Sequence, residues 1–320
     1  MINISLCNGT SCIESEREAL LKLKHDLRDP SHRLASWIGD NGDCCKWGGV
    51  LCGNFTGHVL ELNLQNPFSP DDNEAYQRSM LGIQIPKYLA SLVNLRYLNL
   101  SQARFTGMIP HQLGNLSNLQ YLDLSGVYFE LHAETISWLS GLSLLEHLYI
   151  SFVNLSKASD SLLVINSLHS LKELKLSFCE LHHFPLLSSA NFSSLTTLDL
   201  SGNQFQGQIP SRLGNLTSLK HLDLYSNQFN SAVLGWLSKL NDLEVLSLED
   251  NRLQGDISSL GLDNLTSIQK LLLSWNDELG GKIPTSFGKL YGRFYSVVFG
   301  ANGKLGISRF VQQQVEWNCF

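Results

Sequence analysis

The sequence predicts an α/β repeat solenoid, a right-handed superhelix with a parallel sheet on its concave side. Two observations carry this prediction. The stretch 195–218, LTTLDLSGNQFQGQIPSRLGNLTS, recurs with small changes along most of the 320 residues. Its LxxLxL pattern indicates a short strand with leucines inward and the intervening residues outward. Because so short a unit cannot bury its own leucines, copies must stack on both sides to form one continuous core.

The spacing of the units defines the repeat. Successive starts from Leu95 onward lie 24 to 26 residues apart, which fits the range of about 20–29 residues for leucine-rich repeats. We expect the repeats to fill residues 58–290, interrupted by a polar excursion over 65–80 whose prolines and acidic pair mark a surface segment. The nine expected starts are Val59, Leu95, Leu119, Leu145, Leu171, Leu195, Leu219, Leu243 and Ile268.

Two further columns follow these starts. Eight residues after the start, an asparagine side chain can satisfy backbone groups of the turn, and an unmet buried polar group costs about 1–3 kcal/mol. The later units carry Asn203, Asn227, Asn251 and Asn276 there, whereas earlier units carry Ala103, Val127, Val153 and Cys179. We interpret Cys179 as a buried thiol of this column. Two residues further on, a buried apolar spine is predicted from Phe105, Phe129, Leu155, Leu181, Phe205, Phe229 and Leu253.

Residues 12–57 are predicted to cap the open end of the first repeat. Ser15 followed by Glu18 has the spacing of a capping box at a helix N-terminus. A single apolar helical face follows until a proline ends the helix. Trp37 and Trp47 are expected to plug the same end of the core. The apolar face consists of Ala19, Leu20, Leu23 and Leu27.

Four of the seven cysteines crowd into the cap, which indicates disulfide bonds and an oxidising compartment. They are Cys12, Cys44, Cys45 and Cys52. A bond between the adjacent Cys44 and Cys45 is disfavoured, which leaves two pairings open. Cys7, Cys179 and Cys319 have no assigned partner.

The two ends of the chain depart from the repeat. Residues 1–11 lack the charged start and apolar run of a complete signal peptide, so we interpret them as the remnant of a leader. Residues 291–320 contain no LxxLxL, no asparagine column and no cysteine pair. We therefore expect a divergent, non-repeat tail and no C-terminal cap.

Composition narrows the classes of partner. A net charge of -6 and a pI near 5.9 give no basic footprint for nucleic acid. No apolar run is long enough to span a membrane. Asn-x-Ser/Thr sequons agree with secretion, and we expect glycosylation at Asn54, Asn99, Asn115, Asn154, Asn191, Asn215 and Asn264.

Catalytic and metal chemistry receive no support. Asp199 and Asp223 share an outward column about 4.8 Å apart, near the separation of a glycosidase pair. Asp123 repeats the same template, however, and Lys175 beside Asp199 suggests a surface ion pair. His147 and His221 also share a column but lie about 14 Å apart, too far for one ion. We expect no catalytic residue, no metal and no cofactor.

Aromatic residues gather in the outward columns, where exposed rings are the usual anchors of a binding surface. The alternative is a solenoid face that merely tolerates aromatic ladders. Phe152 and Phe178 are neighbours in one column and form the predicted hot spot, while a glycan on Asn99 would block part of the same face. Besides Tyr97 and Tyr121, the face carries the predicted ligand-binding residues Tyr149, Phe152, Lys175, Phe178, Tyr225 and Trp275.

The cap segments CIESEREALL, LASW and DCCKWGGVLC, with the insert GxIP at 107–110, 207–210 and 281–284, resemble plant extracellular leucine-rich-repeat proteins. The phrases FVNLSKA, LSFCELHHFP and LGNLSNLQYLDL are similar to receptor-like proteins of the fungal-xylanase-receptor and scab-resistance type. The resemblance covers residues 12–290. It implies the pairing Cys12–Cys44 and Cys45–Cys52.

The resemblance also implies a function. It points to the N-terminal part of a cell-surface immune receptor ectodomain that lacks a kinase and binds an extracellular protein or peptide, such as a microbial elicitor. Signalling would pass through receptor-kinase co-receptors, and the location would be extracellular or at the plasma membrane. The alternative is a free secreted protein similar to polygalacturonase-inhibiting proteins, which share this cap and repeat.

Overall fold

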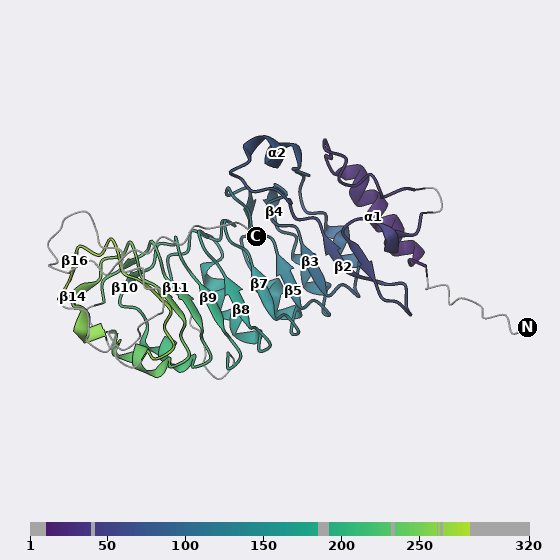
Figure 1. The fold of residues 1–320 in the computed structure, drawn as a ribbon. Helices are drawn as coiled ribbons and strands as arrows, with labels where there is room; N and C mark the ends of the chain where they lie inside the picture. Colours follow the sequence, from purple (N-terminus) through teal and green to yellow (C-terminus); the bar gives the residue numbers. More distant parts are fainter. Residues whose placement is uncertain are drawn as a thin grey trace, which may run out of the picture.

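The computed structural model describes residues 11–39, 42–184, 192–231, 234–260, 262 and 265–281. They form a curved solenoid with helix α1 (Glu14–Asp26) at its N-terminal end and strands stacked along its length (Figure 1). The main sheet has ten strands, in which β1 (Val50–Cys52) is antiparallel to β2 (Val59–Asn63) and all later pairs are parallel. The predicted solenoid and parallel sheet are confirmed.

The nine parallel strands begin at the predicted repeats. After β2 they are β3 (Tyr97–Asn99), β5 (Tyr121–Asp123), β7 (His147–Tyr149), β8 (Glu173–Lys175), β9 (Thr197–Asp199), β11 (His221–Asp223), β13 (Val245–Ser247) and β15 (Lys270–Leu272). Their central leucines lie directly opposite one another, as Leu98 does to Leu122. Each is buried in one continuous core that runs from the cap to Leu279.

Short elements complete each unit. Three two-stranded sheets form from β4 (Gly107–Met108) with β6 (Leu131–His132), β10 (Gln206–Gly207) with β12 (Gln228–Phe229), and β14 (Gln254–Asp256) with β16 (Glu278–Gly280). The repeats also carry the 3-10 helices η2 (Lys87–Ser91), η3 (His111–Asn115), η4 (Ser137–Gly141), η5 (Ser159–Ser167), η6 (Ser211–Asn215), η7 (Gly235–Lys239) and η8 (Ile257–Leu260). Neighbouring 3-10 helices pack on one another.

The predicted asparagine column is a hydrogen-bonded ladder. Asn203 Nδ2 donates to the carbonyl oxygens of Leu176, Leu200 and Ser201 at 2.8, 3.0 and 3.1 Å. Its Oδ1 accepts from the backbone N–H groups of Cys179 and Leu181, both at 3.1 Å. Asn227, Asn251 and Asn276 are buried and repeat the donor bonds, and their Oδ1 atoms accept from the N–H groups of Phe205, Phe229 and Leu253. The side chains thus satisfy backbone groups that the sheet leaves unpaired.

The cap differs from prediction at the start of its helix. Helix α1 begins at Glu14 after Ile13, with no side-chain cap, so the predicted capping box of Ser15 and Glu18 is wrong because Ser15 lies inside the first turn. The backbone of Ile13 instead donates to Gly57 O at 3.2 Å. The buried Glu16 carboxylate accepts from Val59 N–H at 2.6 Å and contacts His58 Nδ1 at 2.9 Å. These bonds hold the helix on the first parallel strand.

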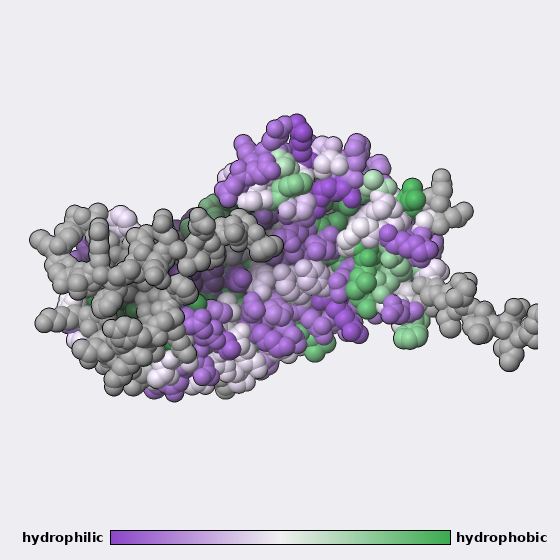
Figure 2. Space-filling model, viewed as in Figure 1, coloured by the Kyte–Doolittle hydropathy of each residue, from purple (hydrophilic) through white to green (hydrophobic). Residues whose placement is uncertain are grey.

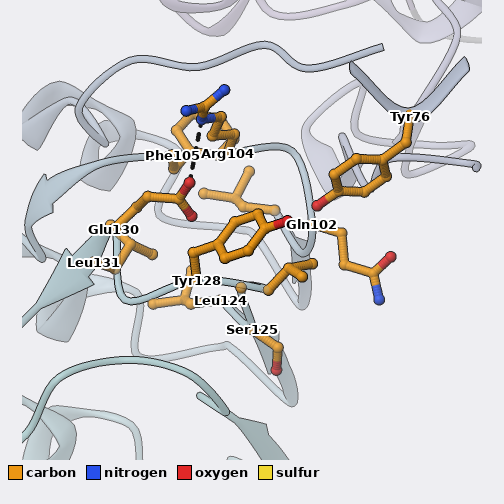
Figure 3. A pocket seen from close by; sticks show the side chains of 12 residues that line it. Tyr76, Gln102, Arg104, Phe105, Leu124, Ser125, Tyr128, Glu130 and Leu131 are labelled. Atoms are coloured by element: carbon orange, nitrogen blue, oxygen red, sulfur yellow. Dashed lines mark hydrogen bonds and ion pairs between the residues drawn. The ribbon is translucent and has the colours of Figure 1, made fainter. Parts of the chain in front are cut away.

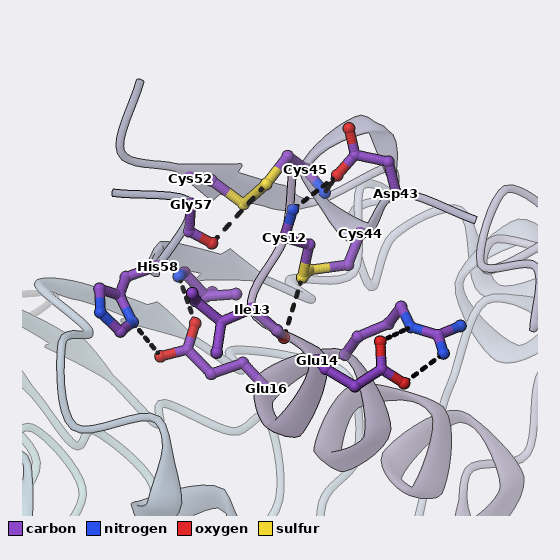
Figure 4. Close-up of a disulfide and its surroundings, with 12 residues drawn as sticks. Cys12, Ile13, Glu14, Glu16, Asp43, Cys44, Cys45, Cys52, Gly57 and His58 are labelled. Carbon is purple, nitrogen blue, oxygen red and sulfur yellow. Dashed lines mark hydrogen bonds and ion pairs between the residues drawn. A yellow bond between two sulfur atoms is a disulfide. The ribbon is translucent and has the colours of Figure 1, made fainter. Parts of the chain in front are cut away.

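The rest of the cap follows the prediction. Leu20, Leu23 and Leu27 are buried, and Trp37 stacks on Trp47 with ring centroids 5.4 Å apart. The two disulfides that the resemblance implies, Cys12–Cys44 and Cys45–Cys52, are both present (Figure 4). They tie the start of α1 and strand β1 to η1 (Cys44–Lys46).

The polar excursion over 65–80 is a folded element. It contains helix α2 (Asn73–Arg78), whose Tyr76 side chain is buried. Asn66 Nδ2 donates to Tyr76 O at 3.0 Å. Arg33 donates from the cap to Ser79 O at 2.6 Å and to Leu64 O at 3.1 Å. The cap therefore fixes both ends of the excursion.

The predicted apolar spine is correct at six of its seven positions and wrong at Phe129. Phe129 is 46% exposed, whereas Phe105, Phe205 and the other members are buried. In this unit the backbone turns at Tyr128, whose O accepts from Glu130 N–H at 2.7 Å. Leu131 on β6 takes the buried place instead, which leaves the Phe129 ring outside the core.

Some expectations lie outside the described residues. These are the tail 291–320, Cys7, Cys319, and the sequons at Asn191 and Asn264. Among the helices that the structure describes, none has the length and apolar content needed to cross a bilayer.

Candidate functional site

The first part of the candidate site is a tyrosine cluster on the outward positions of strands β3 to β8. We define it as Tyr97, Tyr121, Tyr149, Glu173 and Lys175. The rings of Tyr97 and Tyr121 stack with centroids 4.3 Å apart, and Tyr121 meets Tyr149 edge-on at 5.3 Å. Tyr149 Oη donates to Glu173 Oε2 at 2.5 Å, and Lys175 Nζ lies 4.6 Å from the centre of the Tyr149 ring. In the view of Figure 2, polar side chains dominate the surface over these middle strands.

Burial raises the pKa of two tyrosines in this cluster and of one neighbouring carboxyl group. Desolvation raises the pKa of the Tyr121 and Tyr149 hydroxyls, and the bond to Glu173 raises that of Tyr149 further. Desolvation also raises the pKa of the buried Asp123 carboxyl, while the Lys175 charge opposes that rise. Tyr121 and Tyr149 therefore stay neutral.

The expected ion pair of Lys175 with Asp199 does not form. The two residues lie directly opposite each other on β8 and β9, but within the described ranges they share no ion pair. Lys175 instead places its ammonium group over the Tyr149 ring, an attraction of about 0.5–1 kcal/mol at exposed sites. Asp199 Oδ1 accepts from Ser201 N–H at 3.0 Å and from Ser201 Oγ at 2.7 Å.

The second part is a phenylalanine stack, which we define as Phe129, Phe152 and Phe178. The rings of Phe152 and Phe178 are 4.8 Å apart and inclined by 7°, and Phe129 lies 6.0 Å from Phe152. A Cβ atom on Gly202 would lie 2.4 Å from Cδ1 of Phe178, so the ring covers this glycine. The three rings thus form one continuous apolar strip that ends on Gly202.

Backbone geometry gives the stack its position. Phe152 and Phe178 have φ angles of 60° and 53°, at a turn where Gly202 has 63°. A left-handed conformation costs a side-chain-bearing residue roughly 1–2 kcal/mol. Ring stacking stabilises this arrangement by about 0.5–1.5 kcal/mol per pair. Glycine would suit this turn better, so the rings are placed outward against the local preference of the backbone.

The structure brings together four of the six predicted ligand-binding residues. Tyr149 and Lys175 meet in the tyrosine cluster, and Phe152 and Phe178 meet in the phenylalanine stack. Tyr225 and Trp275 are 39% and 58% exposed on later units and make no ring contact with these four. Sequence reasoning missed Glu173, although its outward position opposite His147 was available. It also missed Phe129, which had been assigned to the core.

A recess lies between the excursion and the turn of the unit that contains Phe129 (Figure 3). Tyr76, Gln102 and Tyr128 line it together with the ion pair of Arg104 Nε and Glu130 Oε1 at 3.1 Å. Desolvation raises the pKa of Tyr76 to about 12 and that of Glu130 above its ordinary value. The recess thus offers a neutral phenol and a paired charge beside the phenylalanine stack.

The cap cysteines are unsuited to metal binding. In the described part of the chain, they form the sole group of cysteine, histidine or acidic side chains close enough to hold one ion. All four sulfur atoms are in disulfides, so they offer no thiolate ligand.

The sequons differ in accessibility. Asn54, Asn115 and Asn215 are exposed and Asn154 is half-buried. Asn99 is 2% exposed, and its Nδ2 donates to Gln65 Oε1 and Tyr97 Oη, both at 3.2 Å. A glycan needs this same nitrogen atom, so the folded structure argues against our expectation of a glycan at Asn99. The tyrosine cluster beside it would then stay uncovered.

Comparisons with known proteins match the cap and the repeats separately. The leucine rich repeat N-terminal domain family matches residues 13–53, and leucine rich repeat families match residues 94–116 and 193–238. Receptor-like protein EIX1 of Solanum lycopersicum is 32% identical over 266 residues, a match that covers 65% of this chain and 25% of that protein. The chain thus spans about a quarter of the length of that relative.

Two solved structures show the same fold. A plant ice-binding protein superposes with a TM-score of 0.72 at 24% identity, covering 91% of this chain and 86% of that one, which is a likeness of fold alone. The ectodomain of the Arabidopsis receptor kinase HAESA, in complex with an N-terminally extended IDA peptide hormone ligand, gives a TM-score of 0.66 at 26% identity, covering 89% of this chain and 49% of that one. The repeats, the sheet and these matches agree on a leucine-rich-repeat solenoid fold, and the chain is similar to plant receptor-like proteins.

Proposed function

We propose that this chain is the ligand-recognition part of a plant cell-surface immune receptor-like protein. It binds an extracellular protein or peptide, such as a microbial elicitor, on the concave face and acts through receptor-kinase co-receptors. It performs no catalysis. It works outside the cell or at the plasma membrane, with glycans on the exposed Asn54, Asn115 and Asn215 and on the half-buried Asn154.

The observation that carries this proposal is the phenylalanine stack. Three rings lie outside the core on a rigid scaffold, two of them in a backbone conformation that disfavours them. Rigid aromatic side chains in such positions are the usual energetic centre of an interface. The tyrosine cluster lies on the same run of strands and adds neutral hydroxyls, a carboxylate and an ammonium group. The peptide in the HAESA structure supports the kind of partner.

A selection experiment tests the proposal. The full chain, secreted from plant cells, is used to select binders from a displayed library of random peptides. Phe152→Ala with Phe178→Ala should lower the affinity for the enriched peptides at least about tenfold, because the two rings form the anchor of the binding surface. The control removes two phenylalanines outside the stack, the exposed Phe55 in the cap and Phe68 in the excursion, and should leave the affinity unchanged.

Failure has a clear form. If no peptide is enriched, or if the control weakens binding as much as the double substitution, the proposal is rejected. The immune role is tested separately in leaves that express the full-length receptor. There the double substitution should abolish the response to a microbial extract. Inhibition of a fungal polygalacturonase by the secreted chain would instead favour the inhibitor alternative.

A further inference from the structure

The concave face beyond the phenylalanine stack is negatively charged. Asp199 on β9 and Asp223 on β11 lie directly opposite each other, and Glu249 follows the next strand, β13. Within the ranges that the structure describes, none of the three belongs to an ion pair. The nearest lysine in the same column, Lys175, is directed over Tyr149. The sheet face thus presents three carboxylates without a resident cation.

These carboxylates disfavour one another. Burial raises the pKa of Asp223, and the charges of Asp199 and Glu249 raise it further. Like charges on neighbouring strands destabilise the folded chain unless a cation lies between them. A basic group supplied by a partner would remove that repulsion, so the face is complementary to positive charge.

An exposed tyrosine lies on the same run of units as the three carboxylates. Tyr225 is two residues beyond Asp223 and 39% exposed. Its carbonyl oxygen accepts from Gly202 N–H at 2.8 Å, and the next residue, Ser226, donates to Glu249 O at 3.0 Å. Tyr225 therefore lies between the unit of Asp199 and the unit of Glu249. A guanidinium group can stack on such a ring while it bonds to adjacent carboxylates.

The charged surface is continuous with the apolar strip. The Phe178 ring covers Gly202, and the backbone N–H of Gly202 donates a hydrogen bond to the Tyr225 carbonyl oxygen. Phe178 follows β8 and Tyr225 follows β11, two strand spacings away. Strands in a sheet are about 4.8 Å apart and an extended chain rises about 3.3 Å per residue, so this distance corresponds to about three residues of a peptide that crosses the strands.

We propose that the sheet face from β8 to β13 binds an extended basic peptide segment. One apolar side chain of that segment lies on the phenylalanine stack. About three residues away, an arginine or lysine side chain lies among Asp199, Asp223, Tyr225 and Glu249. This inference rests on the proposed function and specifies the chemistry of the ligand.

The probes are the random displayed library and synthetic copies of the peptides that the full chain enriches. Enriched sequences should contain arginine or lysine about three residues from an apolar side chain. Replacement of that basic residue by glutamine should weaken binding on the order of tenfold. Raising the salt concentration should weaken the original peptide much more than its glutamine copy.

Substitutions in the protein complete the test. The combined substitutions Asp199→Asn, Asp223→Asn and Glu249→Gln should lower the affinity for the basic peptide about tenfold. They should leave the affinity for its glutamine copy unchanged. The amides retain the acceptor oxygens that Ser201 and Tyr225 use, and a thermal melt checks the fold. The matched control removes the same charge elsewhere through Glu74→Gln, Glu134→Gln and Asp242→Asn, all at exposed positions outside the main sheet, and should have little effect.

The outcomes separate the two proposals. If the chain enriches peptides that lack basic residues, this inference fails and peptide recognition stands. The inference also fails if the enriched peptides are basic but the three sheet substitutions weaken them no more than the control does. If the chain enriches no peptide, the proposed function fails and this inference fails with it.

Discussion

The units from β9 to β15 and the units from β5 to β8 solve the same structural problem in different ways. In the later units, Asn203, Asn227, Asn251 and Asn276 each donate to three carbonyl oxygens. The earlier units have no asparagine at that position. Val153 fills its place with a buried apolar side chain, and Cys179 fills it with a thiol. The ladder is therefore a preferred solution but not a required one.

Cys179 shows how the substitution works. Its Sγ donates to Ile150 O at 3.2 Å and to Ser177 O at 3.5 Å, which are the same places in the repeat as the Leu176 and Ser201 carbonyls that Asn203 binds. The thiol thus serves two of the three carbonyls with one weak donor. The units that lack the ladder carry the tyrosine cluster and the phenylalanine stack, whereas Tyr225 and Trp275 stand singly on units that have it. Regularity marks the scaffold, and the departures from it coincide with the candidate site.

The largest expected effect comes from removing the ladder where it exists. Asn203→Ala leaves three carbonyls and two N–H groups of the buried backbone without their partner, and we expect a loss of about 3 kcal/mol in the free energy of unfolding. Asn203→Cys should lose about half as much, because a thiol is compatible with this position at Cys179. Denaturant unfolding measures the loss, and hydrogen exchange should accelerate most at the Cys179 and Leu181 amides.

The comparison would be wrong if Asn203→Ala cost no more than a typical surface substitution, or if the thiol variant were as damaging as alanine. Either result would show that the ladder bonds contribute little and that packing of the leucines alone holds the later units.

A second substitution tests the end of the phenylalanine stack. Gly202→Ala adds a Cβ atom 2.4 Å from the Phe178 ring at a φ of 63°. We expect a loss of about 2 kcal/mol, since the left-handed conformation costs alanine roughly 1–2 kcal/mol and the ring must also move. Peptide affinity should fall with stability. Ser226→Ala, at the same place in the next unit with a φ of 49°, is the control and should change neither quantity appreciably.

Cys179 should matter less. Cys179→Ala removes a small buried side chain and a weak donor, which predicts a loss of about 1 kcal/mol. In the native chain, burial raises the pKa of the thiol, so alkylation by iodoacetamide should occur only after unfolding. Mass spectrometry of the peptide that contains Cys179 separates it from the other cysteines. Rapid alkylation of the folded chain at this residue would contradict the buried position.

Sequence reasoning was accurate where one residue type has one structural role. The leucine starts placed nine parallel strands, and the four ladder asparagines were assigned to the backbone groups that they bind. The disulfide pairing needed the resemblance, because two pairings were open from the residues alone. Such positions are set by the period of the repeat, so counting along the chain is enough to find them.

The predictions from the sequence were wrong where a side chain has more than one possible partner. Counting placed Phe129 in the core, but a turn at Tyr128 gave that place to Leu131. Pairing by column gave Lys175 to Asp199, but its long side chain reaches the Tyr149 ring instead. Ser15 fitted a capping box, yet the contacts of Glu16 with Val59 and His58 hold the helix start. Each error came from tertiary contacts that the period of the repeat does not fix.

The smallest expected effect is a gain in stability, and it compares one carboxylate from each region. Burial raises the pKa of both Asp123 on β5 and Asp223 on β11. The Lys175 charge opposes this rise at Asp123, whereas the Asp199 and Glu249 charges add to it at Asp223. A folded-state pKa above the unfolded value of about 4 means that the folded chain binds the proton more tightly. The ionised carboxylate therefore destabilises the fold at neutral pH, and this penalty disappears as pH falls through the raised pKa.

Asp223→Asn should therefore stabilise the chain at pH 7 by less than about 1 kcal/mol, with a gain that shrinks toward pH 4. Asp123→Asn should gain less, since Lys175 already compensates part of its charge. Thermal unfolding across this pH range measures both. A loss of stability in Asp223→Asn at pH 7 would mean that the carboxylate serves the scaffold. A gain in stability together with weaker binding of a basic peptide would mean that the charge is present for the ligand and at the expense of the fold.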